Sequence, residues 1–240
     1  MQIGGITHIF MIIASIIFLV VLMFIVSKLH KRGQNIVFFA IVLICMAGIF
    51  YLHGTHYGTS LDIVNLLKQQ LQVCNFNFIL LPLCLIPKNE LARQYLFYFS
   101  LFCALSTFVA YPSSIENSYW YQKECLNFWI DHLLIVALPL TFIASKRFKP
   151  QKEYIFKVML CIFIYYSIAF LGNLILDGFD FSNLVHNYSY TMNAGAVMIL
   201  QPLYDLISIP FVYLLPLVPF MYLFFWLLAY LFRNYKVKKY

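Results

Sequence analysis

The run IFMIIASIIFLVVLMFIV (Ile9–Val26) has no charged residue, and it is followed within a few positions by Lys28, Lys31 and Arg32. An apolar stretch of roughly 20 residues is long enough to cross a bilayer as an α-helix. No basic residue precedes this run, whereas a cleavable signal peptide has a positive segment there and a shorter apolar core. We therefore expect a retained membrane-spanning helix that ends where the basic residues begin.

The composition of the whole chain is that of a membrane protein. Its 240 residues are 63% hydrophobic and only 10% charged, whereas soluble domains have about 25% charged residues. No Pro/Ser-rich linker and no internal repeat divides the chain, so we expect a single polytopic membrane domain over residues 1–240. The sequence predicts an all-α membrane protein with seven transmembrane helices, at about 8–27, 35–52, 71–87, 95–112, 126–144, 154–176 and 210–232.

The basic residues indicate an orientation for these helices. Of the 16 Lys and Arg residues, all except Lys68 and Lys123 lie after the first, third, fifth and seventh apolar segments or at the foot of the sixth. Cytoplasmic loops are enriched in Lys and Arg, so the N-terminus is predicted outside and the C-terminus cytoplasmic. This topology accounts for the net charge of +7. No soluble segment is large enough to bind nucleic acid, and we expect no such partner.

Polar side chains concentrate in the predicted outer half of the protein. Cys74 lies about one turn into the third segment, and Asp131 and His132 lie about two turns into the fifth. A thiol within reach of an imidazole is the minimal nucleophile–base pair for acyl transfer. Asp131 points about 100° away from His132 on a helix. We therefore expect a partner for His132 from the last external loop, at Asn187 or Tyr188.

Simpler interpretations of these residues stay open. Cysteine is among the most buried residue types and usually only packs, and a membrane histidine often just bonds between helices. Cys74 has two polar neighbours, Gln72 and Asn75, and they favour a functional role for its thiol. The other cysteines of the spans are interpreted as packing residues, since they lack such polar neighbours: Cys45, Cys84, Cys103 and Cys161.

Metal and cofactor chemistry have little support in the sequence. Asp177, Asp180 and His186 could join His132 as ligands, but no motif of the H-E-x-x-H type and no C-x-x-C pair occurs. Glycine-rich phosphate loops and dinucleotide fingerprints are also absent from the sequence. We expect no metal and no cofactor.

Two local patterns predict structural features. Residues 60–71 have apolar side chains at helical spacing, which is typical of an amphipathic helix on the outer surface or of an extension of the third span. Pro216 and Pro219 lie inside the last predicted span, where each removes a backbone donor and is expected to kink the helix.

Four short motifs, in order along the chain, resemble a known family. They are LQVC (71–74), FWIDHLL (128–134), HNYSY (186–190) and the stretch from Leu203-Tyr204-Asp205 to Tyr213. The chain is similar to the YwaF-like integral membrane proteins of bacteria, which are related to the eukaryotic transmembrane protein 164 family.

The resemblance implies a seven-span fold in a bacterial plasma membrane. For the eukaryotic branch it implies transfer of fatty acyl chains among phospholipids through a cysteine nucleophile. Carried over, Cys74 matches the family cysteine and His132 the family histidine, while Asn187 and Tyr188 match the loop motif. The chain departs from the family at Gln72, where the family has histidine.

The sequence thus predicts a membrane-embedded lipid acyltransferase. Cys74 and His132 are the expected catalytic pair, Gln72, Asp131, Asn187 and Tyr188 the expected substrate-binding residues, and a phospholipid or lysophospholipid the expected partner. A transporter or lipid-binding protein that uses the same polar pocket remains an alternative, as does a non-catalytic accessory subunit.

Overall fold

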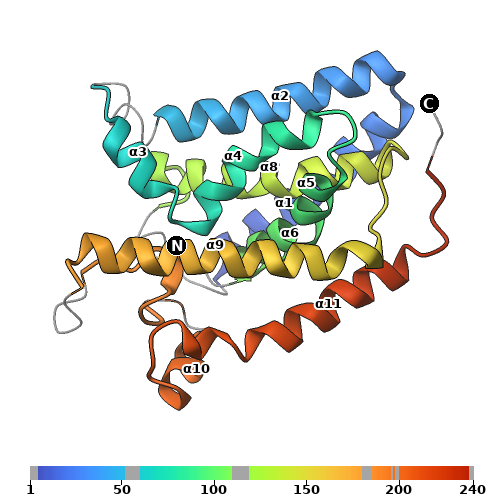
Figure 1. Ribbon diagram of the computed structural model, residues 1–240. Coiled ribbons are helices and arrows are strands. Elements are labelled where there is room, and N and C mark those ends of the chain that lie inside the picture. Colours follow the sequence, from blue (N-terminus) through green and yellow to red (C-terminus); the bar gives the residue numbers. More distant parts are fainter. Residues whose placement is uncertain are drawn as a thin grey trace.

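The computed structural model describes residues 5–51, 60–109, 119–179, 185–195, 197 and 200–237, and within these ranges all regular structure is helical. Figure 1 shows the helices along the chain. The longer ones are α1 (Ile6–Lys28), α2 (Lys31–Ile49), α4 (Val73–Leu85), α8 (Lys123–Ala144), α9 (Ile155–Leu176) and α11 (Leu217–Leu231). The shorter ones are α3 (Ile63–Gln69), α5 (Glu90–Tyr95), the π-helix η2 (Leu96–Ser100), α6 (Leu101–Val109), η3 (Lys152–Tyr154), η4 (Tyr188–Tyr190), α10 (Gln201–Leu206) and η5 (Val212–Leu214).

The helices identify a multi-pass, all-α membrane protein. Five helical stretches of the described chain are long and apolar enough to cross a bilayer: 6–28, 31–49, 125–144, 152–176 and 212–231. Two further predicted spans are also helical, though differently built. Helix α4 is a shorter apolar helix, and α5, η2 and α6 form one continuous helical run over residues 90–109.

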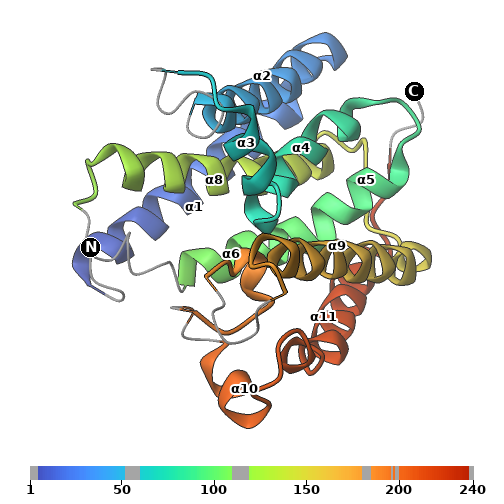
Figure 2. The ribbon, with the colours of Figure 1, turned by 60° about the vertical axis from the view of Figure 1, so that its left-hand side comes forward.

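Helix α8 lies at the centre of the bundle. Helices α1, α2, α4 and α6 all pack against it, and α9 and α11 lie side by side across the other flank (Figures 1 and 2). The α8 side chains Ile135, Ala137 and Leu138 are at most 1% exposed. Helix α1, by contrast, presents most of its Ile and Phe side chains outward, as expected for a helix whose solvent is lipid.

Polar caps fix the turns around α4. The carboxylate of Asp62 accepts a hydrogen bond from the amide of Asn65 and starts α3, which ends before α4 begins. The predicted amphipathic helix is therefore a separate helix rather than an extension of α4. At the other end, the guanidinium of Arg93 donates to the carbonyls of Cys84 and Ile86, because the last carbonyls of α4 have no partner within the helix.

The last helical stretch, residues 212–231, is interrupted at the first of its two prolines. The short helix η5 ends at Leu214, and α11 starts at Leu217. Pro216 is the N-cap of α11, and Pro219 lies in the first turn of the helix. A backbone N–H has no helical acceptor at those positions, so proline costs nothing there. The expected interruption of the span therefore falls at Pro216, where α11 starts, whereas α11 continues through Pro219.

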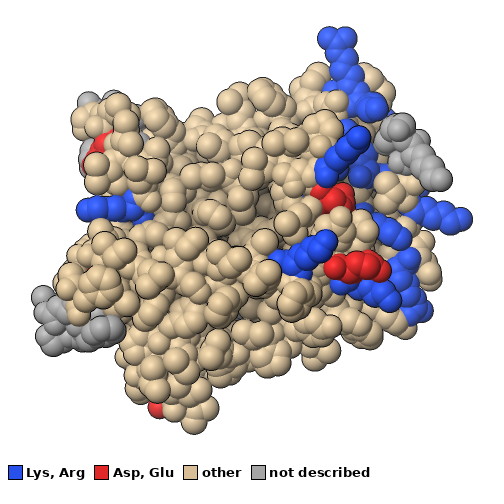
Figure 3. Space-filling view, in the orientation of Figure 1, with Lys and Arg blue, Asp and Glu red and all other residues tan. Residues whose placement is uncertain are grey.

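Basic residues gather at one end of the molecule. Figure 3 shows Lys and Arg concentrated at the end where α1 joins α2, α4 joins α5 and α8 joins α9. The basic residues that follow alternate apolar segments in the sequence therefore come together at one end of the folded protein.

Candidate functional site

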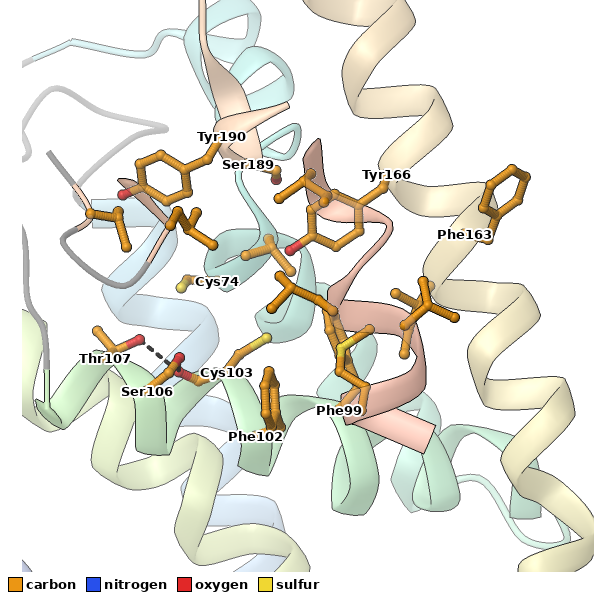
Figure 4. A pocket seen from close by; sticks show the side chains of 18 of the residues that line it. Cys74, Phe99, Phe102, Cys103, Ser106, Thr107, Phe163, Tyr166, Ser189 and Tyr190 are labelled. Carbon is orange, nitrogen blue, oxygen red and sulfur yellow. Dashed lines mark hydrogen bonds between the residues drawn. The ribbon is translucent and has the colours of Figure 1, made fainter. Parts of the chain in front are cut away.

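A cavity of about 580 Å³ lies between α4, α6, α8, α9 and α11 (Figure 4). Its volume falls in the range of roughly 300–1,000 Å³ that is usual for small-molecule sites. Most of its wall is apolar, formed by side chains such as Phe99, Phe102, Met159, Ile162 and Met221. The polar groups of the wall gather at one end, around Cys74.

Cys74 lies in the first turn of α4 and contributes its side chain to the cavity wall. The hydroxyl of Thr107 on α6 lies near this thiol, and it donates a hydrogen bond to the carbonyl of Cys103, 2.7 Å away. Figure 4 shows Cys74, Thr107 and Tyr190 on the same side of the cavity. The thiol thus lies beside a small polar region while it also packs against the apolar core.

His132 reaches the same cavity from α8, and its hydrogen bonding defines its tautomer. Its Nδ1 lies 2.7 Å from the carbonyl oxygen of Phe128. A carbonyl can only accept, so Nδ1 carries the hydrogen and Nε2 of the neutral ring keeps its lone pair. Nε2 is buried and has no hydrogen-bond partner among the described residues. The lone pair of this nitrogen is therefore unused within the described part of the protein.

The loop after α9 covers this polar end of the cavity. The hydroxyl of Ser189 donates to the carbonyl of Leu71 at 2.5 Å, and the phenol of Tyr165 donates to the same carbonyl at 2.7 Å. Tyr213 holds the next residue by donating to the carbonyl of Tyr190. The loop is therefore tied to the turn before α4, to α9 and to η5, and it places Ser189 and Tyr190 in the cavity wall.

Gln72 connects the turn before α4 with that loop. Its Oε1 accepts a hydrogen bond from the backbone amide of Ser189 at 2.8 Å, and its side chain lies within hydrogen-bonding reach of the Tyr190 phenol. Gln72 also lines the cavity. It occupies the sequence position two before Cys74 at which the resemblance leads one to expect histidine, and here it is an acceptor that orders the loop.

Asn187 and Tyr188 shape the loop without forming the cavity wall. The side chain of Asn187 accepts from the amides of Met192 and Asn193 and donates back to Asn193. The backbone of Tyr188 exchanges two hydrogen bonds of 3.0 Å with the side-chain amide of Asn173 on α9. Their polar groups are thus engaged in holding Ser189 and Tyr190 in place.

Asp131 faces away from the cavity, toward α2. A Cβ added at Gly48 of α2 would lie 3.1 Å from its Oδ1, which shows how closely the carboxylate approaches that helix. The structure thus brings Cys74, His132 and Gln72 to one cavity and leaves Asp131, Asn187 and Tyr188 outside its wall.

The backbone of the covering loop is in a costly conformation. Ser189 and Tyr190 both have positive φ, at 55° and 57°. Residues other than glycine pay about 1–3 kcal/mol in such conformations and keep them only where the surroundings impose them. Such strained residues cluster at functional sites, and here they are the two loop residues that line the cavity.

An aspartate–histidine pair fastens the start of the loop. The carboxylate of Asp177 accepts from the backbone amide of His186 and lies 2.6 Å from its Nδ1. Desolvation raises the pKa of Asp177, but the hydrogen bonds from His186 outweigh it and leave that pKa below its usual value. Asp180, also considered as a metal ligand, lies outside the described residues. Within the described chain no three His, Cys, Asp or Glu side chains are grouped as a metal site.

Several cavity residues were not identified from the sequence. Cys103 was interpreted as packing, yet it lines the cavity together with Ser106 and Thr107. The spacing of these three residues places them on one face of α6, and this polar stripe was the available signal. The positions of Ser189 and Tyr190 depend on long-range hydrogen bonds, which no local pattern reveals.

One comparison with known proteins identifies a relationship. The model of the TMEM164 family matches residues 3–230. No curated protein and no solved structure matches the chain. Since the family model covers nearly the whole sequence, including the described helices from α1 to α10 and the residues around Cys74 and His132, the chain belongs to the TMEM164 family.

Proposed function

We propose that this protein is a membrane-embedded lipid acyltransferase that works through a thioester on Cys74. The observation that carries the proposal is that one cavity is lined by both Cys74 and His132, a histidine whose Nε2 is buried and has no partner among the described residues. Membership of the TMEM164 family supports the proposal. Around this pair the wall is apolar, as a fatty acyl chain requires.

The shape of the cavity supports a lipid substrate. Along α9 its wall extends from Phe156 to Tyr166, a helical distance of about 15 Å. The lining residues Phe156, Phe163 and Phe220 are 74%, 51% and 58% exposed, so the cavity has an open side between α9 and α11. In a bilayer that side adjoins the acyl chains of the surrounding lipid, and an acyl chain can lie along the wall with its ester near Cys74.

The proposed reaction has two steps. Nε2 of His132 takes the thiol proton of Cys74, and the thiolate attacks the acyl carbonyl of a phospholipid. The C–O ester bond breaks, the leaving alkoxide takes the proton from His132, and a lysophospholipid departs while the acyl group stays on sulfur. In the second step His132 takes the proton of an acceptor hydroxyl, which attacks the thioester, and the Cys74 thiolate leaves and is reprotonated.

The remaining predicted residues act on the site through the loop. Gln72, Asn187 and Tyr188 position Ser189 and Tyr190 beside the thiol, and the Tyr190 hydroxyl is our candidate donor to the carbonyl oxygen as it becomes negative. Asp131, directed toward α2, would contribute to packing of the bundle rather than to substrate binding.

We infer a topology and a location from the same features. The short α4 and the 90–109 run complete seven spans, with the N-terminus outside and the basic end in the cytoplasm. Cys74 then lies near the outer leaflet. The YwaF-like motifs favour the bacterial branch of the family and the bacterial plasma membrane.

The proposal can be tested with the full-length protein reconstituted in nanodiscs. The protein is incubated with a phospholipid that has an ω-alkyne acyl chain, and its covalent labelling is measured. A label that hydroxylamine cleaves should form in the wild type, disappear in Cys74→Ala and fall at least about tenfold in His132→Asn, since base catalysis contributes roughly 10²–10⁴-fold. The asparagine amide can still donate to the Phe128 carbonyl. Cys103→Ala, which removes another thiol of the same cavity, should retain the label.

A label that persists in Cys74→Ala, or that never forms in the wild type, would overturn the proposal that the protein is an acyltransferase through Cys74. The open apolar cavity also fits a lipid-binding or transport protein. Photocrosslinking of a diazirine phospholipid to the cavity wall, with no thioester formed on the protein, would favour this second function.

A further inference from the structure

A second cavity, of about 470 Å³, lies at the basic end of the molecule. It is formed by the segment Lys149–Glu153, which leads into α9, and by the last turns of α11 with Arg233 beyond them. It shares no residue with the Cys74 cavity. Nothing in the proposed acyl transfer uses it.

The lining of this cavity is cationic. Lys149, Lys152 and Arg233 contribute three positive side chains and Glu153 one carboxylate, so the net charge of the lining is +2. Within the part of the chain that the structure describes, none of the three cations has a carboxylate at salt-bridge distance. The positive charge of the cavity is therefore not neutralised by neighbouring carboxylates and can attract an anion.

Arg233 is held in a defined position at the rim. Its guanidinium carbon lies 3.8 Å from the ring centroid of Tyr230, and Tyr230 in turn stacks on Trp226 at 5.5 Å. Such cation–π contact orients the planar guanidinium. The five donors of that group match the geometry of phosphate oxygens.

The opposite wall is anchored to the bundle. The fully buried side chain of Gln94 on α5 donates to the carbonyl of Lys149 at 3.0 Å and accepts from the amide of Gln151 at 3.1 Å. The Gln151 side chain donates to Glu90 at 3.2 Å. The segment that bears the two lysines is thus fixed on both sides of Pro150, and the cavity is preformed.

The position of the cavity at the ends of two spanning helices matches the expected level of lipid headgroups. It sits where α9 begins and α11 ends, both of which are long enough to span the bilayer. Trp226 and Tyr230 are half-exposed aromatic residues, the type that is enriched at the membrane–water boundary. The adjacent face of α11 is exposed and apolar at Leu227, so a ligand here can keep its tails in lipid.

We propose that this cavity binds the phosphate headgroup of an anionic phospholipid. The phosphodiester would lie between Arg233 and the two lysines, since basic pockets between helices on the cytoplasmic side recognise anionic headgroups. Glu153 opposes a multiply charged anion and suits a headgroup with hydroxyls to donate, as in phosphatidylglycerol. The site is independent of the chemistry at Cys74.

The test measures lipid retained by the purified full chain. Protein in neutral detergent is equilibrated with equimolar phosphatidylglycerol, phosphatidylethanolamine and phosphatidylcholine, captured, washed, and its bound lipid quantified by mass spectrometry. The triple variant Lys149→Gln/Lys152→Gln/Arg233→Gln is compared with a matched triple at the same end, Lys28→Gln/Lys146→Gln/Lys236→Gln, which removes equal charge outside the cavity. A further arm adds inorganic phosphate as competitor.

We expect about one phosphatidylglycerol per protein in the wild type and in the matched triple. The cavity triple should retain at least about tenfold less, because each basic group near a membrane surface contributes roughly fivefold to anionic lipid binding. The single variant Lys152→Gln, at an exposed position, should retain about fivefold less phosphatidylglycerol than the wild type. This variant decides the test if the triple variant does not fold.

An equal loss of phosphatidylglycerol in both triple variants would mean that the lipid is held by general electrostatic attraction rather than by this cavity, and it would overturn the proposal. Equal retention of phosphatidylethanolamine would also overturn it. Displacement of the lipid by millimolar inorganic phosphate would assign the cavity to the free ion instead.

Discussion

The side chain of Gln72 accepts a hydrogen bond from the backbone amide of Ser189 across 117 positions of sequence, at 2.8 Å. Through this bond the residue two positions before Cys74 determines where the covering loop lies. Ser189 is only 1% exposed, so its amide has no ready substitute for the Gln72 oxygen.

Removing that acceptor should destabilise the protein. Gln72→Met keeps the length of the side chain but leaves the Ser189 amide unsatisfied, which costs about 1–3 kcal/mol. Thermal unfolding in detergent measures the effect. Gln69→Met, which removes only a weak contact of 3.5 Å to Asn65, is the matched control and should change stability far less. Equal effects of the two variants would contradict the role of Gln72.

The covering loop should loosen in acid. Because the hydrogen bonds from His186 lower the folded-state pKa of Asp177 below its usual value of 3.8, their stabilisation is present above that value and is lost as the pH falls through the lower, folded value. Hydrogen exchange of residues 185–195 between pH 5 and pH 2.5 should show this transition. Asp177→Asn should remove it, whereas Asp205→Asn should leave it intact. A transition unchanged in Asp177→Asn would refute the assignment.

A close contact beside the site should be measurable as energetic coupling. A Cβ at Gly172 of α9 would lie 2.7 Å from Cδ1 of Leu71, whose carbonyl anchors the loop. The Leu71 side chain must move aside for a methyl group there, so Gly172→Ala should lose most of the gain of about 1 kcal/mol that alanine has over glycine in a helix. In the background of Leu71→Ala the same change should stabilise the protein by the full amount of about 1 kcal/mol. Strict additivity in this double-mutant cycle would exclude the clash.

Filling the cavity should select against long acyl chains. Met159 lies on the apolar wall, and Met159→Trp places an indole where the chain is proposed to run. Labelling by a long-chain alkyne phospholipid should fall roughly tenfold relative to a short-chain analogue, in line with about 1–3 kcal/mol of overpacking. Ile168→Trp, on the lipid-exposed face of the same helix, is the control. An unchanged ratio of the two labels in Met159→Trp would place the chain elsewhere.

Much of the fold follows from the sequence by simple physics. An uncharged run such as Ile9–Val26 has no alternative to a helix in lipid, since each unpaired backbone group would cost several kcal/mol there. The same pattern predicted α8 and α9 almost to their ends. It was less exact at α11, because proline specifies a helix start as readily as a kink, and α11 starts only at Leu217.

The site was predictable only in part. Cys74 and His132 could be singled out because they are reactive groups in apolar segments, and the structure places both in one cavity. Asn187 and Tyr188 were correctly located in the covering loop, but which residues of a loop face inward depends on the positive φ angles at Ser189 and Tyr190. Local sequence did not indicate those angles, since neither residue is glycine.

The side of the Cys74 cavity that lies between α9 and α11 is bounded by side chains that the protein leaves uncovered, such as Phe156 and Phe163. A molecule that enters there from the lipid, as we propose, arrives by lateral diffusion within the bilayer. The occupancy of the cavity is then governed by the mole fraction of that molecule in the leaflet rather than by its molarity in water. Diluting it with an inert lipid should empty the cavity, while changing the aqueous volume should have no effect.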